Sequence, residues 1–173
     1  IIDYNSPRIG GDNPDFLYGQ ALISGSYDYR IYGNKNDAFN ISFGSYYGGL
    51  GSDKGLQCSG NIQLKELSIG NDGRFDILVS QKNNHENWLP TINETNSILI
   101  RQTILHREID TPADINIELV NSSLSGQIKQ PLSSSQLADS LNLSGMFVEG
   151  VVKQFLHWTH NFKSCLLYTS PSP

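Results

Sequence analysis

The feature that most constrains the fold is an alternation of apolar and polar residues with a period of two. Its apolar members are Phe39, Ile41 and Phe43, then Phe75, Ile77 and Val79, then Ile115, Ile117 and Leu119. Successive side chains of a strand point to opposite faces, so each stretch has one face for a core and one for solvent. Clusters of Gly, Asn and Asp separate the stretches. The sequence therefore predicts a mainly β fold, an antiparallel β-sandwich or a jelly-roll-like domain.

Two turn sequences predict β-hairpins. We expect residues 33–37 to join strands at 27–32 and 38–43, and residues 71–73 to join strands at 62–69 and 74–79. Gly73 can supply the positive φ that a tight turn requires. The alternation slips at Lys65 and Glu66, which favours a bulge there. Residues 97–105 begin with apolar side chains on both faces, as a central strand does.

After this β region, the apolar spacing becomes helical. Leu137, Leu141, Val148, Val151, Val152 and Phe155 recur at helical intervals. Ser133 and Gln136 fit a capping box, and Gly145 and Gly150 are the kind of residue that marks close packing against a neighbour. We therefore expect a β-sandwich domain at 1–121, a linker at 122–131 and an amphipathic helix at 132–164.

The two ends of the sequence predict a fragment. Residues 165–173 back-translate into a transposase end used in library preparation, so we expect them to be translated sequencing adapter, with a natural Ser/Pro linker as the alternative. The chain opens at Ile1 without Met or a signal-peptide pattern. Because the adapter follows the helix directly, we expect the helix to lead into a C-terminal half beyond residue 164. Because no N-terminal signal is in view, the sequence does not predict the localisation.

Charge and composition exclude some classes of partner. The formal net charge is −5 and Lys and Arg form no cluster, which argues against nucleic acid. No apolar run approaches the ~20 residues of a membrane-spanning helix. Without residues 165–173 the remaining cysteine is Cys58, so no intrachain disulfide is expected.

Four residues near the strand at 97–105 are candidates for catalysis. His85 precedes this strand, and His106, Glu108 and Asp110 follow it. If the two loops meet at one end of the sandwich, these side chains can form an acid–base cluster; the alternative is solvated loop charge. His157 and His160 are three residues apart on the helix but lack the H-E-x-x-H pattern, so no metal site is predicted.

Aromatic residues are the candidates for ligand binding. Tyr46, Tyr47 and Trp88 can stack on sugar rings, although packing on a pleated sheet is the commoner role of such side chains. Glycines at residues 44–51 lack the spacing of a phosphate-binding loop and do not open a helix. The sequence therefore predicts no cofactor.

Several segments resemble a bacterial family whose members carry the domain of unknown function 1214. The matching segments are residues 11–15, 27–33, 72–75, 87–90, 99–103 and 112–115, and the similarity runs from about residue 10 to about residue 160. The similar part is the region N-terminal to the named domain. The resemblance implies a β-sandwich or jelly-roll architecture and no established activity. His106 and Arg107 stand where the family has an Asp-Trp pair.

Two functions remain open on these grounds. One is a binding or structural module whose ligand is a carbohydrate or another small polar molecule. The other is part of an enzyme whose active site is completed by the C-terminal half of the same chain. The helix can also assemble a homo-oligomer if its apolar stripe is exposed.

Overall fold

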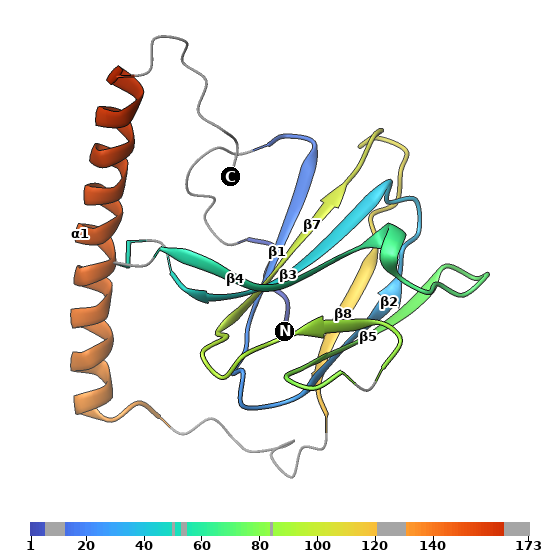
Figure 1. Cartoon of the computed structure of the whole chain (residues 1–173), viewed down its shortest axis with the longest axis horizontal. Helices are drawn as coiled ribbons and strands as arrows, with labels where there is room; N and C mark the ends of the chain where they lie inside the picture. The colour runs from blue at the N-terminus through green and yellow to red at the C-terminus, as the bar shows by residue number, and fades with distance from the viewer. Residues whose placement is uncertain (6–12, 50, 53–54, 84, 121–130, 165–173) are drawn as a thin grey trace. The chain divides into compact units, whose positions relative to one another are not determined.

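A computed structural model describes residues 1–5, 13–49, 51–52, 55–83, 85–120 and 131–164 of the chain (Figure 1). The described strands are β1 (Phe16–Leu22), β2 (Tyr29–Asn34), β3 (Asn40–Gly48), β4 (Leu56–Gln63), β5 (Arg74–Ser80), β6 (Trp88–Pro90), β7 (Ser97–Thr103) and β8 (Asp114–Leu119). A 3₁₀ helix, η1, spans Leu64–Glu66, and the α-helix α1 spans Ser134–Ser164. The predictions for residues 165–173 and for most of the 122–131 linker lie outside the described residues.

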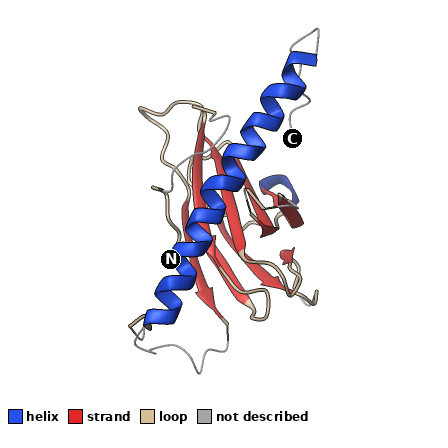
Figure 2. Cartoon of the chain, turned by 90° about the vertical axis from the view of Figure 1, so that its left-hand side faces the viewer, coloured by secondary structure: helices blue, strands red, loops and turns tan. Residues whose placement is uncertain are grey.

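The strands form two four-stranded sheets, seen in red in Figure 2. Sheet A has the order β1-β7-β3-β4, and sheet B has the order β6-β5-β2-β8. Strand β7 runs antiparallel to both β1 and β3, and β2 runs antiparallel to both β5 and β8, whereas β6 lies parallel to β5. The predicted mainly β sandwich followed by one helix is confirmed, as is the central position of the strand that begins at Ser97.

The alternating residues form the core between the sheets. Buried apolar side chains include Ile31, Ile41, Phe43, Phe75, Ile77, Val79, Leu89, Ile98, Ile100 and Ile115. Phe43 and Phe75, from opposite sheets, have ring centroids 5.7 Å apart. Phe39 is an exception, with 65% of its surface exposed. It lies just before the first residue of β3, outside the part of the strand that contributes to the core. Burial of these side chains is the main driving force for closing the sandwich.

Both predicted hairpins are wrong, although both turns exist. Residues 35–39 connect β2 of sheet B to β3 of sheet A, and residues 64–73 connect β4 of sheet A to β5 of sheet B. Gly73 has the predicted positive φ, 81°. In place of the bulge, η1 begins after Gln63, whose N–H donates to Glu66 Oε2 at 2.7 Å. Turn residues reverse the chain, but the sheet that receives the next strand is decided by core packing between distant segments.

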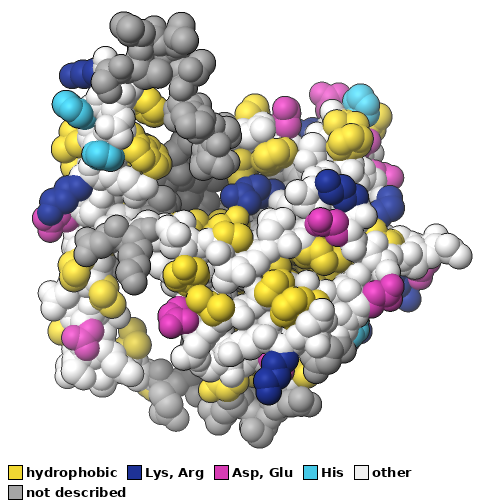
Figure 3. Space-filling view, in the orientation of Figure 1, with side chains coloured by type: hydrophobic (Ala, Val, Ile, Leu, Met, Phe, Trp, Pro, Cys, Tyr) yellow, Lys and Arg dark blue, Asp and Glu magenta, His cyan; other side chains and the backbone are white. Residues whose placement is uncertain are grey.

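The predicted capping box of α1 is confirmed. The Ser133 N–H donates to Gln136 Oε1 at 2.9 Å, and the Gln136 N–H donates to Ser133 Oγ at 3.2 Å. Exposed apolar residues on α1 include Leu137, Leu141, Met146, Val148, Val152, Leu156 and Phe162, and Figure 3 shows hydrophobic side chains along the helix. In the part of the chain that is described, no helix has the length and apolarity needed to cross a bilayer.

The chain divides into two compact units, one with residues 1–47 and 57–126 and one with residues 48–56 and α1. In the second unit, the Gly51 N–H donates to Gln154 Oε1 at 3.0 Å. A Cβ added to Gly150 would lie 1.9 Å from the Gly51 carbonyl oxygen, whereas one added to Gly145 would have no neighbour within 4 Å. Close packing is therefore confirmed at Gly150 and not at Gly145. Residues 48–56, which we expected to belong to the sandwich, group with the helix.

Candidate functional site

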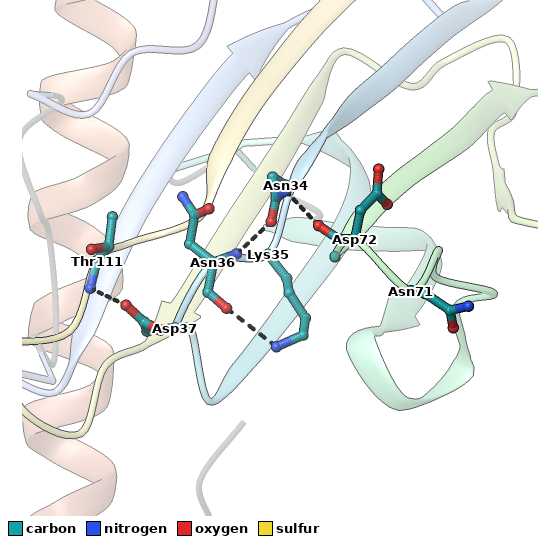
Figure 4. Close-up of a pocket in the computed structure, with 8 residues that line it drawn as sticks. Asn34, Lys35, Asn36, Asp37, Asn71, Asp72 and Thr111 are labelled. Carbon is teal, nitrogen blue, oxygen red and sulfur yellow. Dashed lines mark hydrogen bonds between the residues drawn. The ribbon is translucent and has the colours of Figure 1, made fainter.

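A polar hollow of about 420 Å³ lies at the end of sheet B where β2 ends and β5 begins (Figure 4). Its lining residues are Asn34, Lys35, Asn36, Asp37, Asn71, Asp72, Gly73 and Thr111. Amide and carboxylate groups of this kind can recognise the hydroxyls of a polar ligand.

Most of these polar groups already serve the turns that carry them. Asn34 Nδ2 donates to the Asp72 carbonyl at 2.9 Å, and Asn34 Oδ1 accepts from the Asn36 N–H at 2.9 Å. Asp37 Oδ2 accepts from the Thr111 N–H at 3.0 Å. Asn36 has a φ of 44°, which Asn tolerates better than most residues. The hollow is therefore chiefly a product of loop construction, and few of its groups remain available to a ligand.

A second hollow, also of about 420 Å³, surrounds the turn after β7 and contains His106 and Glu108 together with Asp15. The His106 N–H donates to Asp110 Oδ2 at 2.8 Å. The Arg107 guanidinium donates to the carbonyls of Pro14 and Phe16, which ties the turn to the start of β1. Three of the four catalytic candidates thus share one short turn.

His85, the fourth candidate, lies in the loop before β6 and does not line this hollow. Its side chain is exposed, and Nδ1 lies 3.1 Å from the Asn87 carbonyl oxygen. His157 and His160 are exposed on α1, with His157 Nε2 3.0 Å from Asn161 Nδ2. Across the described ranges, no three His, Cys, Asp or Glu side chains are grouped so as to hold a metal ion.

Tyr46 forms an aromatic surface on the outer face of sheet A. Ile41, Phe43 and Ser45 of β3 point into the core, so Tyr46 points away from it together with Gly44. A Cβ added to Gly44 would lie 2.5 Å from Tyr46 Cε2 and 2.8 Å from its hydroxyl oxygen. The ring therefore lies over the glycine, and only the missing side chain at position 44 leaves room for it.

Arg101 stands at the hydroxyl end of this ring. It lies on β7 between Tyr18 of β1 and Ser42 of β3 in the strand register, and its Nη1 donates to Tyr46 Oη at 3.3 Å. The side chains of Tyr46 and Arg101 are both half-buried. Among the residues that the structure describes, the Tyr46 hydroxyl is the one polar partner of this guanidinium, and no carboxylate pairs with it.

The three aromatic candidates do not form one cluster. Tyr47 points to the opposite face of β3 from Tyr46. Trp88 lies on β6 of sheet B, where its Nε1–H donates to the Ser80 carbonyl at 3.1 Å. Gly44 and Arg101 are the site residues that sequence reasoning missed. Their signal was present in the alternation, which places Gly44 and Tyr46 on one face of β3 and gives β7 a charged residue on its outward face.

No protein-family model and no curated protein matches the sequence. A solved structure of an uncharacterised protein from Burkholderia cenocepacia is similar to this chain, with 33% sequence identity and a TM-score of 0.80. The VPA0106 protein from Vibrio parahaemolyticus is similar at 16% identity with a TM-score of 0.45, over 62% of this chain and 31% of that chain.

The match to the Burkholderia protein covers 91% of this chain and 44% of that chain, so this chain spans less than half of that protein's length. The matched share of this chain is larger than the share that precedes α1, because residues 1–133 make up less than four fifths of the 173 residues. The residues after α1 are too few to account for the difference, so the match includes part of α1.

Proposed function

We propose that the sandwich is a binding module whose ligand is a carbohydrate or a similar small polar molecule, held on the outer face of sheet A around Tyr46. The observation that carries this proposal is the Tyr46 ring lying over Gly44. A pyranose ring has an apolar C–H face, and stacking that face on an aromatic ring removes apolar surface of both from water. A ring held against its own strand loses little conformational freedom when a ligand binds.

The two hollows support ligand binding less well. Backbone groups of the turns occupy the carboxylate or amide oxygens of Asn34, Asp37 and Asp110. Recruiting these oxygens for a ligand breaks existing hydrogen bonds, which costs about as much as the new bonds return. On sheet A, binding at Tyr46 displaces no such partner.

A binding assay on the whole chain tests the proposal. Titration of the ¹⁵N-labelled protein with a set of neutral and charged methyl glycosides should perturb resonances of β3 and β7. Tyr46→Ala should abolish the perturbation, whereas Tyr27→Ala, which removes an exposed tyrosine outside the proposed site, should leave it unchanged. Absence of binding by any glycoside, or binding that survives Tyr46→Ala, overturns the proposal.

The chain is also proposed to be the part of a longer bacterial protein that precedes the domain of unknown function 1214, with a strand arrangement of the jelly-roll kind. The match to 44% of the Burkholderia protein supports a longer protein. The exposed apolar residues of α1, among them Leu141, Val148 and Val152, supply a surface that the rest of such a protein or a second copy can bury.

The alternative function is an enzyme whose site is completed by that remainder. The common turn of His106, Glu108 and Asp110 favours it, because such a turn can present both an acid and a base to a second domain. Its test is alanine substitution of these three residues in the longer protein; an activity that survives all three changes excludes them as its acid and base.

A further inference from the structure

We infer that the Tyr46 surface selects sugars that carry a carboxylate, such as uronic acids, and that Arg101 provides the selection. This inference rests on the proposed function, since it assigns the class of ligand to the same site. It goes beyond that function because a bare aromatic surface would not distinguish a neutral sugar from an acidic one.

The first argument is the state of the Arg101 charge. Arg101 is half-buried, and its guanidinium has one hydrogen bond, at 3.3 Å, to a neutral hydroxyl. Arginine has five N–H donors, and loss of water from an unpaired charge is unfavourable. Contact with an anion would return both the hydrogen bonds and the charge compensation that partial burial removes.

The second argument is the position of Arg101 relative to the aromatic ring. Its Nη1 contacts the hydroxyl of Tyr46, so the guanidinium lies at one edge of the surface on which a sugar would stack. Leu99 is directly opposite Gly44 in the register and extends the apolar surface across to β7. Ser42 is directly opposite Arg101 and adds a hydroxyl beside it. A ring substituent that projects from the stacked sugar therefore meets the guanidinium.

The third argument separates carboxylates from phosphates. The planar fork of one guanidinium matches the two oxygens of a carboxylate. A phosphate group carries up to two charges and is commonly held by several cations or by backbone N–H groups at a helix start. The described residues that flank Arg101 in the register, Tyr18 and Ser42, and those two places further along, Leu99 and Thr103, include no second cation. At these positions Arg101 is the one cation, which favours a ligand with a single negative charge.

The test compares three ligands on the whole chain near neutral pH. Methyl β-glucuronide, methyl β-glucoside and glucose 6-phosphate are titrated separately, with affinities from NMR shifts. We expect the glucuronide to bind at least tenfold more tightly than the glucoside. Arg101→Gln should bring the glucuronide to the affinity of the glucoside, and Arg101→Lys, which keeps the charge without the fork, should lose part of the preference.

Gly44→Ala is a second variant that does not touch the charge. The added methyl must displace the far end of the Tyr46 side chain, so binding of both glycosides should weaken while the fold is kept, as measured by thermal unfolding. Equal affinity for glucuronide and glucoside overturns the inference and leaves the proposed function standing. Tighter binding of glucose 6-phosphate, or a preference that survives Arg101→Gln, also overturns it. Binding of none of the three overturns the inference, and the wider glycoside set then decides the proposed function.

Discussion

The two sheets of the sandwich place a similar pair of residues, an arginine beside a tyrosine, in opposite electrostatic situations. On the outer face of sheet B, Arg30 Nε donates to Asp76 Oδ2 at 2.6 Å and Nη1 donates to Glu118 Oε1 at 3.2 Å. The guanidinium also lies 4.9 Å from the centre of the Tyr32 ring. These hydrogen bonds to Asp76 and Glu118 raise the pKa of Arg30. Every charge in this group has a partner.

On the outer face of sheet A, Arg101 has the Tyr46 hydroxyl and no carboxylate among the described residues. The inner faces differ as well. Sheet B contributes Ile31, Ile77 and Val79 to the core and buries Ser80 at the end of β5, whereas sheet A buries Gln102 and Ser45 among its apolar residues. The comparison teaches that the charges on the outer face of sheet B are paired within that sheet, while Gln102 and Arg101 of sheet A need partners from outside their sheet. For Gln102 the partner is another loop of the chain, and for Arg101 we have proposed a ligand.

The largest expected effect concerns the inner face of sheet A. Gln102 Oε1 accepts from the Ala113 N–H at 2.8 Å, and Gln102 Nε2 donates to the Ala113 carbonyl at 3.4 Å. Gln102→Leu removes both hydrogen bonds, so the N–H and the carbonyl of the buried Ala113 lose their Gln102 partner. We expect the free energy of unfolding to fall by about 2–3 kcal/mol, measured by chemical denaturation.

Ile98→Val is the matched control, because Ile98 is a fully buried apolar residue of the same strand. Loss of one buried methyl group should cost about 1 kcal/mol. If Gln102→Leu costs no more than Ile98→Val, the hydrogen bonds to Ala113 are not a requirement of sheet A, and its inner face is no more dependent on outside partners than that of sheet B.

The second-largest expected effect is a loss of ligand affinity. It is expected in a variant that gives the arginine of sheet A a carboxylate partner like that of the arginine in sheet B. Ser42→Glu places a carboxylate directly opposite Arg101, as Glu118 is directly opposite Arg30. The new ion pair should lower glucuronide affinity at least tenfold, or about 1.4 kcal/mol, because the anion site is then occupied. Ser42→Gln has a similar shape without charge and should keep most of the affinity; equal losses in the two variants would mean that bulk, and not charge, closes the site.

Much of the fold was predictable from the sequence because its signal is local. The alternation at Ile41, Phe43, Ile77 and Val79 reports burial residue by residue, and the Ser133–Gln136 capping box depends on four consecutive residues. Strand pairing was not predictable in the same way. Asn36 and Gly73 mark turns correctly, but the partners of β2 are β5 and β8, whose pairings close long loops that no local pattern encodes.

The candidate site was only partly predictable for a related reason. Tyr46 was recognisable as an aromatic residue, but its role depends on Arg101, which is 55 positions away along the chain. Those two residues meet because β3 and β7 are neighbours in sheet A. The same lack of pairing information explains why His85 was grouped with His106 in the sequence, although one lies before β6 and the other after β7.

A smaller effect on stability is expected when the carboxylate partners of Arg30 on sheet B are removed. The double change Asp76→Asn and Glu118→Gln removes both partners of the exposed Arg30 side chain. Exposed ion pairs contribute little, so the free energy of unfolding should fall by about 1 kcal/mol or less, and the loss should shrink between about 0.01 M and about 1 M salt. Arg101→Gln, measured in parallel, should show no such dependence on salt. A salt-dependent loss at Arg101 would reveal a carboxylate partner and remove the contrast between the sheets.

The smallest effect is expected at Tyr4, which interacts with both sheets. Its phenol lies near the Gln102 side chain of sheet A and near the Asp114 charge of sheet B. Burial raises its pKa above the usual value of 10.0, the Gln102 side chain lowers it to a smaller extent, and Asp114 raises it further. A phenol whose pKa is higher in the folded chain contributes stability below its unfolded pKa and loses it as the pH rises through the folded value. The free energy of unfolding should therefore decline above about pH 10, and Tyr4→Phe should make this decline shallower. Tyr27→Phe, at an exposed tyrosine, serves as the control; if both variants give the same slope, Tyr4 does not couple the two sheets through its ionisation.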